Sequence, residues 1–250
     1  MIREPFAEGH SWMHRIDPRL RVVGASAFTV LVAVADAPPA LFTALGLSVV
    51  AAAAARLNAA EVARHLKGPA LFVLMLWAVL PWSYEGPALA HLGPLTLTRP
   101  GVALCAQISL KTTALLVTFM ALVATMSVDT LGHSLSRLRV PDKAVYLLLI
   151  TYRYIFVLEQ EYQRLVRAIK IRNFHPGTNL HSYRTYAYLV GMLFVRASER
   201  AHRVHCAMIC RGFSGRFISL RSYPADGLNR VFSLTVALCL VLLATLQYWK

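Results

Sequence analysis

Five long apolar blocks, separated by polar stretches, constrain the fold of this 250-residue chain more than any other feature. Hydrophobic residues make up 57% of the sequence and charged residues only 15%, whereas a soluble domain carries about 25% charged residues. About 17–25 apolar residues cross a bilayer as a helix; the first two blocks, with 16 residues each, fall just under this length, and the third is shorter. We therefore predict an all-α integral membrane protein with about five transmembrane helices. The blocks are Leu20–Ala35, Ala40–Ala55, Pro69–Trp82, Ala103–Ser127 and Val231–Gln247.

Two local features qualify these blocks. The first two flank the turn-forming sequence Asp36-Ala37-Pro38-Pro39, which predicts a helical hairpin. The fourth block contains Lys111, and an ionisable residue inside a membrane span is by default a functional candidate. Its long side chain can equally snorkel to the surface or pack against a neighbouring subunit. Because no partner acid is evident in the sequence, both interpretations of Lys111 stay open.

A long basic segment precedes the last block. Residues 128–230 hold 16 of the 26 lysines and arginines, together with two short apolar runs, Ala144–Leu158 and Tyr186–Val195. Runs of this length are typical of packed or interfacial helices rather than spans. We therefore divide the chain into residues 1–127 (the N-terminal tail and four transmembrane helices), 128–230 (cytoplasmic coupling helices) and 231–250 (the last transmembrane helix).

The distribution of basic residues predicts the orientation. With the N-terminus in the cytoplasm and five crossings, 23 of the 26 basic residues lie inside and only Arg99 and Lys250 lie outside. Letting the two short apolar runs cross as well would send five basic residues of the 164–184 stretch outside. The five-span arrangement, in the cell (inner) membrane with a cytoplasmic N-terminus, is therefore favoured.

A sequence repeat marks the basic segment. The pattern R-x-x-x-A-x-x-x-R-x-F begins at Arg164 and recurs 39 residues later at Arg203. The fourfold spacing places Arg, Ala and Arg on one stripe of a helix. Asn173 and Gly212 follow the second arginine of each copy, and both residue types favour a left-handed helix C-cap. We predict two helices that each end on an arginine, Arg172 and Arg211. The alternative is that these arginines merely complement the helix dipole.

Three stretches resemble a known family. They are HRIDPR at residues 14–19, TYRYIFVL at residues 151–158 and AMICRGFSGRF at residues 207–217. The chain resembles the transmembrane coupling subunit (the T component, EcfT type) of energy-coupling factor importers, and within it the CbiQ branch for cobalt or nickel. That family carries two X-Arg-X signatures at the ends of its coupling helices. The resemblance implies that the ATPase-coupling residues here are Ile171, Arg172, Asn173, Cys210, Arg211 and Gly212.

The resemblance also implies the partners. These are a pair of ABC-type ATPase subunits, a small substrate-binding membrane subunit that holds the metal ion, and the lipid bilayer. The chain itself is then a non-catalytic transporter subunit without a cofactor, and it lacks a G-x-x-x-x-G-K-[ST] phosphate loop. The implied mechanism is mechanical: motions of the ATPase pair move the two coupling helices, which tilt the substrate-binding subunit.

Other function classes find less support in the sequence. A membrane-embedded enzyme acting on a lipid or quinone head group is the alternative, but the acidic residues are few and scattered. No nucleic-acid-binding pattern accompanies the net charge of +14. His202, Cys206 and Cys210 share one helical stripe, yet three ligands on a straight helix rarely close a coordination shell. We therefore expect no metal site in this chain.

Overall fold

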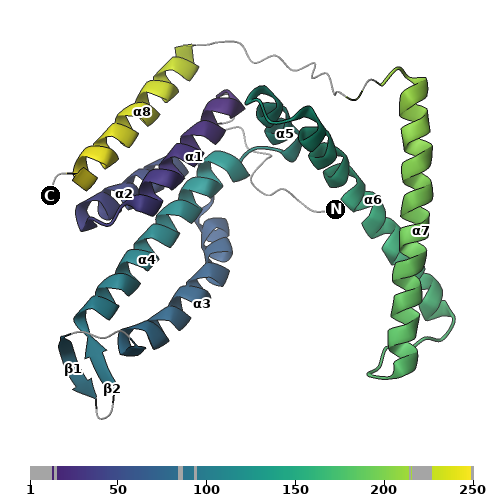
Figure 1. Ribbon diagram of the computed structural model, residues 1–250, viewed down its shortest axis with the longest axis horizontal. Helices are drawn as coiled ribbons and strands as arrows, with labels where there is room; N and C mark the ends of the chain where they lie inside the picture. The colour runs from purple at the N-terminus through teal and green to yellow at the C-terminus, as the bar shows by residue number, and fades with distance from the viewer. Residues whose placement is uncertain are drawn as a thin grey trace. The chain divides into compact units, whose positions relative to one another are not determined.

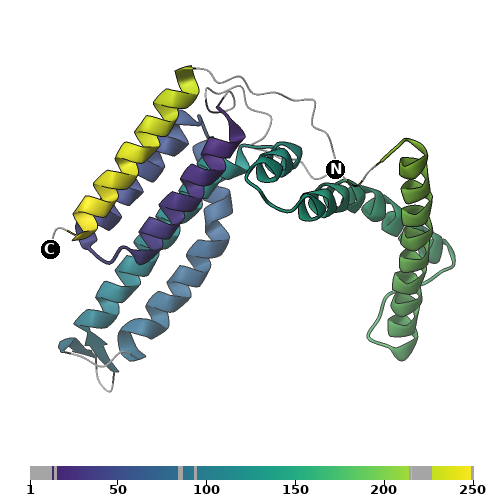
Figure 2. The same cartoon turned by 45° about the horizontal axis from the view of Figure 1, so that its top comes forward.

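The computed structural model describes residues 13, 16–83, 87–92, 95–213, 215 and 227–248, and helices dominate these residues (Figures 1 and 2). The all-α prediction is confirmed, with one addition that the sequence analysis did not predict: β1 and β2 form an antiparallel two-stranded hairpin. The elements in chain order are α1 (Pro18–Val34), α2 (Pro38–Ala54), α3 (Ala59–Ser83), β1 (Ala88–Leu92), β2 (Leu95–Thr98), α4 (Arg99–Phe119), η2 (Met120–Ala124, a π-helix), α5 (Val128–Arg137), α6 (Asp142–Ile171), α7 (Leu180–Cys210) and α8 (Gly227–Tyr248).

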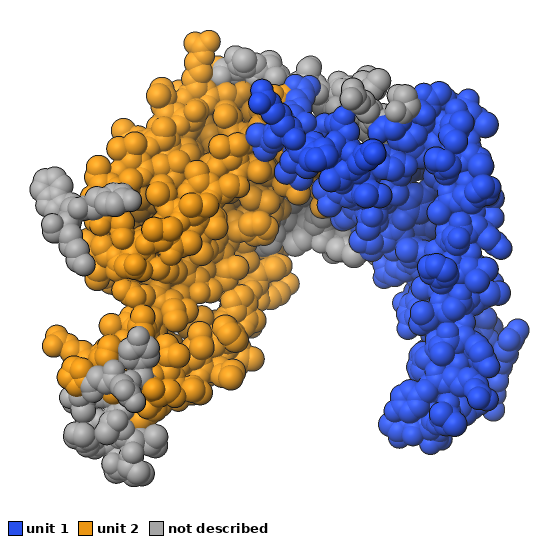
Figure 3. All heavy atoms as spheres, viewed as in Figure 1, with its two compact units in different colours: residues 1–3, 135–221 blue, residues 4–134, 222–250 orange. Residues whose placement is uncertain are grey.

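Contacts divide the chain into two compact units, which Figure 3 shows in different colours. Residues 4–134 and 222–250 form what we call the bundle unit, and residues 1–3 and 135–221 form the helix-pair unit. The helix-pair unit thus contains all of α6 and α7. The sequence analysis placed its boundaries at 127/128, where the fourth apolar block ends, and at 230/231, where the fifth begins. The first boundary falls at the start of α5. The cytoplasmic location of residues 128–230 stays a prediction.

In the bundle unit, α4 is the central helix: α1, α2 and α3 pack against it, while α8 packs against α1 and α2 (Figure 2). The start of α1 follows from its sequence, because Asp17 caps the helix by accepting a hydrogen bond from the Arg19 N–H and Pro18 occupies the first turn. Pro38 and Pro39 likewise begin α2. The predicted hairpin of the first two apolar blocks is confirmed.

Glycine permits a close approach between α3 and α4. A Cβ added to Gly101 would lie 2.9 Å from Pro81 Cα and 3.1 Å from the Leu80 carbonyl oxygen. Any larger residue would therefore push the two helices apart. Farther along the same interface, the Trp77 indole N–H donates to Ser109 Oγ at 2.9 Å.

Among the residues that the structure describes, three helices of the bundle unit are long and apolar enough to cross a membrane: Ala59–Ser83, Arg99–Ala124 and Gly227–Gln247. They contain the third and fifth apolar blocks and most of the fourth, whose last three residues, 125–127, follow the helix. The first two blocks form α1 and α2, which have 17 residues each and are about 25 Å long. That length is at the lower limit for a span. Neither α6 nor α7 meets this criterion of length and hydropathy, but α1 and α2 do not meet it either, so the number of spans stays a prediction.

The helix-pair unit consists mainly of α6 and α7, with 30 and 31 residues. The two helices run antiparallel, because an aromatic contact joins the C-terminal end of each helix to the N-terminal part of the other. Phe174, just after α6, packs edge-to-face on Tyr186 of α7 with ring centroids 5.8 Å apart. Phe213, just after α7, stacks on Tyr146 of α6 at 5.2 Å. The helix pair is therefore fastened near both of its ends.

Candidate coupling site at the ends of two helices

The C-terminus of α6 has the backbone geometry of a Schellman cap. Arg172 is the C-cap residue, and Asn173 follows with a φ of 60°. The Asn173 N–H donates to the Lys170 carbonyl at 3.0 Å, and the Phe174 N–H donates to the Ile169 carbonyl at 3.2 Å. These are the two crossed hydrogen bonds that define the motif. They satisfy carbonyls that the last turn of a helix otherwise leaves unpaired.

The C-terminus of α7 repeats this geometry. Arg211 is the C-cap residue, and Gly212 has a φ of 76°. The Gly212 N–H donates to the Ile209 carbonyl at 2.9 Å, and the Phe213 N–H donates to the Met208 carbonyl at 3.0 Å. The prediction of matched left-handed caps at both helix ends is thus confirmed. Asn173 and Gly212 are chemically different, but both tolerate a positive φ.

All six candidate coupling residues are exposed: Ile171, Arg172, Asn173, Cys210, Arg211 and Gly212. Ile171 is 86% exposed. Within the described ranges, no ion pair involves Arg172 or Arg211. The earlier arginines of the repeat differ, because Arg164 pairs with Glu161 at 3.4 Å and Arg203 pairs with Glu199 at 3.9 Å. The guanidinium groups of Arg172 and Arg211 are therefore available to an acidic partner.

Sequence reasoning missed the ion-pair cluster around Glu161. This α6 carboxylate is only 7% exposed, and it contacts Arg196 and Arg200 of α7 as well as Arg164. The hydrogen bond from Arg196 holds the pKa of Glu161 below its usual range, and the nearby charges of Arg164 and Arg200 act in the same direction, although partial burial opposes them. The cluster joins the two helices that carry the candidate coupling residues.

The stripe of soft ligands on α7 does not form a metal site in the structure. Cys206 Sγ lies 3.7 Å from His202 Nε2, and both Cys206 and Cys210 are free and exposed. Among the described residues, no group of three His, Cys, Asp or Glu side chains is placed to hold a metal ion. The described residues thus offer a pair of neighbouring side chains rather than a coordination shell.

Polar residues fasten one end of the bundle unit. The Asp17 N–H donates to Asn229 Oδ1 of α8 at 3.0 Å, which ties the start of α1 to the start of α8. Buried Arg21 donates to the Met13 carbonyl at 3.1 Å and to Thr125 Oγ1 just after the π-helix. The first family-like stretch, residues 14–19, thus contributes the cap of α1, while His14 and Arg15 lie outside the described residues.

Lys111 has a partner acid that could not be identified in the sequence. Its Nζ lies 3.1 Å from Asp36 Oδ1 and donates to the Ala33 carbonyl at 3.1 Å. Asp36 occupies the turn between α1 and α2, and its backbone N–H donates to the side chain of Gln247 at the end of α8. Lys111 thus fastens the turn to α4 within the chain, a role that neither of the two open interpretations included.

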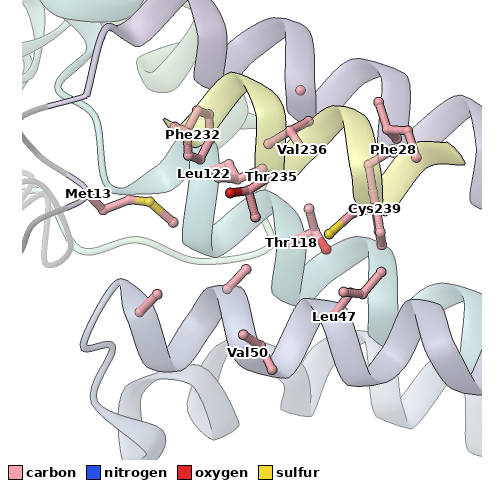
Figure 4. Close-up of a pocket in the computed structure, with 14 residues that line it drawn as sticks. Met13, Phe28, Leu47, Val50, Thr118, Leu122, Phe232, Thr235, Val236 and Cys239 are labelled. Carbon is pink, nitrogen blue, oxygen red and sulfur yellow. The ribbon is translucent and has the colours of Figure 1, made fainter. Parts of the chain in front are cut away.

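An apolar cavity of about 180 Å³ lies inside the bundle unit (Figure 4). Residues of α1, α2, α4, η2 and α8 line it, and Thr118 and Thr235 contribute hydroxyl groups. The remaining labelled side chains in Figure 4, including Phe28, Val50 and Phe232, are apolar or sulfur-bearing. This lining suits hydrocarbon.

Comparison with known proteins places these features in a family. The family model described as "Cobalt transport protein" (CbiQ) matches residues 9–223. The energy-coupling factor transporter transmembrane protein EcfT of Acidaminococcus fermentans is 28% identical, and the match covers 96% of this chain and 94% of that protein. The cobalt transport protein CbiQ of Rhodobacter capsulatus is 30% identical over 61% of this chain and 66% of that protein. A putative ABC transporter ATP-binding protein of Bifidobacterium longum is 25% identical over 81% of this chain, but only 27% of that longer protein is covered.

Proposed function

The chain belongs to the CbiQ family of cobalt transport proteins, and from this we propose that it is the transmembrane coupling subunit of an ATP-driven energy-coupling factor importer for cobalt or nickel ions. The observation that carries the proposal is the pair of matched helix ends. Two exposed arginines follow two Schellman caps, in two antiparallel helices joined to one another. Two equivalent ends suit a partner that offers two equivalent sites, such as a pair of ABC-type ATPase subunits.

Each end is chemically suited to dock into an acidic groove. The cap holds the backbone of the last turn, so that the guanidinium of Arg172 or Arg211 is the projecting donor group. Arginine binds a carboxylate through two parallel hydrogen bonds, a geometry that lysine cannot copy. Exposed Ile171 and the Cys210 side chain add small apolar contacts beside each arginine. Docking would then combine charge pairing with a short apolar contact.

The exposed apolar side chains of α6 and α7 support the second proposed partner, a small substrate-binding membrane subunit that holds the metal ion. Tyr188 is 69% exposed, Phe194 is 74% exposed and Leu147 is 61% exposed. Large apolar side chains gathered on exposed helix surfaces are typical of interaction sites. In the proposed mechanism, closure of the ATPase pair on ATP binding moves the helix ends, and the apolar surfaces of α6 and α7 transmit this motion to the substrate-binding subunit.

The proposed location is the cell (inner) membrane, with the N-terminus and residues 128–230 in the cytoplasm. The count of 23 basic residues on that side supports it. The ATPase subunits would hydrolyse ATP, and this chain would remain non-catalytic. The apolar cavity and the ion-pair cluster agree with such a role, because neither combines a nucleophile with a general base.

Charge reversal at the two ends tests the proposal. Truncating one member of a buried charged pair typically costs about 2–5 kcal/mol. We therefore expect Arg211→Glu and Arg172→Glu each to lower affinity for the ATPase pair by about 30-fold or more, and to nearly abolish metal uptake. The Arg→Lys variants should be intermediate. Arg203→Glu is the matched control, because the ion pair that Arg203 makes among the described residues is with exposed Glu199 on the same helix. Normal ATPase co-purification and uptake in both Glu variants would refute the proposed role.

A further inference from the structure

Glu161 is the one buried charged side chain of α6 and α7, and its arginine partners on α7 are partly exposed. Both helices are fully described, and their buried residues are Val145, Glu161, Ser182 and Leu189. So small a buried set leaves little apolar surface to define the packing of two helices of about 30 residues. The geometry of the pair must then depend strongly on Glu161 and on the aromatic contacts at its two ends.

The carboxylate makes a two-point connection to α7. Arg196 bonds to Oε1 of Glu161, and Arg200 Nη2 lies 3.6 Å from Oε2. Arg164 on α6 also lies 3.4 Å from Oε2 and so steadies the side chain from its own helix. Because Arg196 and Arg200 are one turn apart, a hydrogen bond from one and an ion-pair contact from the other constrain the rotation of α7 as well as its distance from α6.

The position of this connection relates it to the coupling residues. Glu161 and Arg200 are 39 residues apart, which is the same offset that relates Arg172 to Arg211 in the repeat. Arg172 therefore lies 11 residues after Glu161 on α6, and Arg211 lies 11 residues after Arg200 on α7. Each separation is about 17 Å at 1.5 Å per helical residue. The ion pair thus sits at the point from which two arms of equal length extend in opposite directions.

From this arrangement we infer that Glu161, held by Arg196 and Arg200, is a positioning residue that sets the separation of the two docking ends, Arg172 and Arg211. The inference rests on the proposed function. Its consequence is bivalence: a rigid pair of ends at the correct separation converts the second docking event into an intramolecular one. Such linkage raises affinity by about 10²–10⁴-fold and is lost when the geometry is wrong.

A double-mutant cycle separates positioning from simple loss of folding. Glu161→Gln keeps the shape of the side chain and removes its charge. We expect it to weaken binding of the ATPase pair by about tenfold or more. In an Arg172→Glu background only one end can dock, so the separation no longer matters and Glu161→Gln should change affinity less than twofold. The matched control is Glu159→Gln, because Glu159 is exposed on the same helix.

A distance measurement on the full chain completes the test. Positions 167 and 206 are exposed and equivalent in the repeat, so a nitroxide amino acid would be placed at each of them. Pulsed electron resonance should give one narrow distance distribution for the wild type and for Glu159→Gln, and a broad one for Glu161→Gln. An unchanged distribution, or an equal loss of affinity in both backgrounds, would overturn the role of Glu161. If Arg172→Glu and Arg211→Glu bind the ATPase pair normally, the docking assignment fails as well. Weak binding by those two variants with normal binding by Glu161→Gln would refute the positioning role alone.

Discussion

Adding one methyl group at Gly101 should loosen the contact between α3 and α4. The new Cβ would lie 2.9 Å from Pro81 Cα, 3.1 Å from the Leu80 carbonyl oxygen and 2.8 Å from Thr98 Oγ1. Two of these atoms belong to the backbone of α3, so rotation of a side chain cannot relieve the clash. Overpacking of this kind costs about 1–3 kcal/mol. A shift of α3 would also strain the Trp77–Ser109 hydrogen bond, which contributes about 1 kcal/mol.

Unfolding of the purified protein by SDS in mixed micelles measures this cost. We expect Gly101→Ala to lower the unfolding free energy by about 2–4 kcal/mol, the sum of the two effects. Gly68→Ala, also in the α3–α4 region, is the matched control, because no atom lies within 4 Å of a Cβ added to Gly68 of α3. That variant should be neutral or more stable by up to about 1 kcal/mol, since alanine favours a helix interior. A Gly101→Ala protein as stable as the wild type would refute the close packing of α3 on α4.

Three further predictions concern the Glu161 ion pairs, the Lys111–Asp36 ion pair and the membrane topology. The lowered pKa of Glu161 means that its pairing with the arginines is fully present above pH 4.5 and is lost as the pH falls through the lowered pKa. The α6–α7 distance distribution should therefore stay unchanged from pH 8 to pH 5 and broaden only well below pH 4.5. A change in this distribution near neutral pH would contradict the prediction. Lys111→Met should cost at most about 1 kcal/mol in SDS unfolding, because Asp36 is largely exposed, and a larger loss that Asp36→Asn does not share would point to another partner. Single cysteines placed between residues 164 and 184 should resist an impermeant reagent added to intact cells, whereas one at Lys250 should react, and the reverse pattern would overturn the topology.

Local chemistry explains which features could be predicted from the sequence. The helix caps at Asn173 and Gly212 depend on one residue's tolerance of a positive φ, so the sequence was sufficient. The start of α3 was predicted at Pro69, ten residues late, because the charged residues of its first turns hide a segment with high helix propensity. The ion pairs of Glu161 with Arg196 and of Lys111 with Asp36 join residues 35 and 75 positions apart. Only the packing of the helices brings such residues together.

The central claim is that the two capped helix ends contact the ATPase pair, and site-specific photo-crosslinking tests it most directly. A benzophenone amino acid would replace Ile171 or Cys210, beside each arginine, in the intact complex in membranes. Phe42, 63% exposed on α2 of the bundle unit, provides the control position. We predict that positions 171 and 210 each form a crosslink to an ATPase subunit and that position 42 does not. Crosslinks from 171 and 210 to lipid or to the substrate-binding subunit, with none to an ATPase subunit, would contradict the assignment.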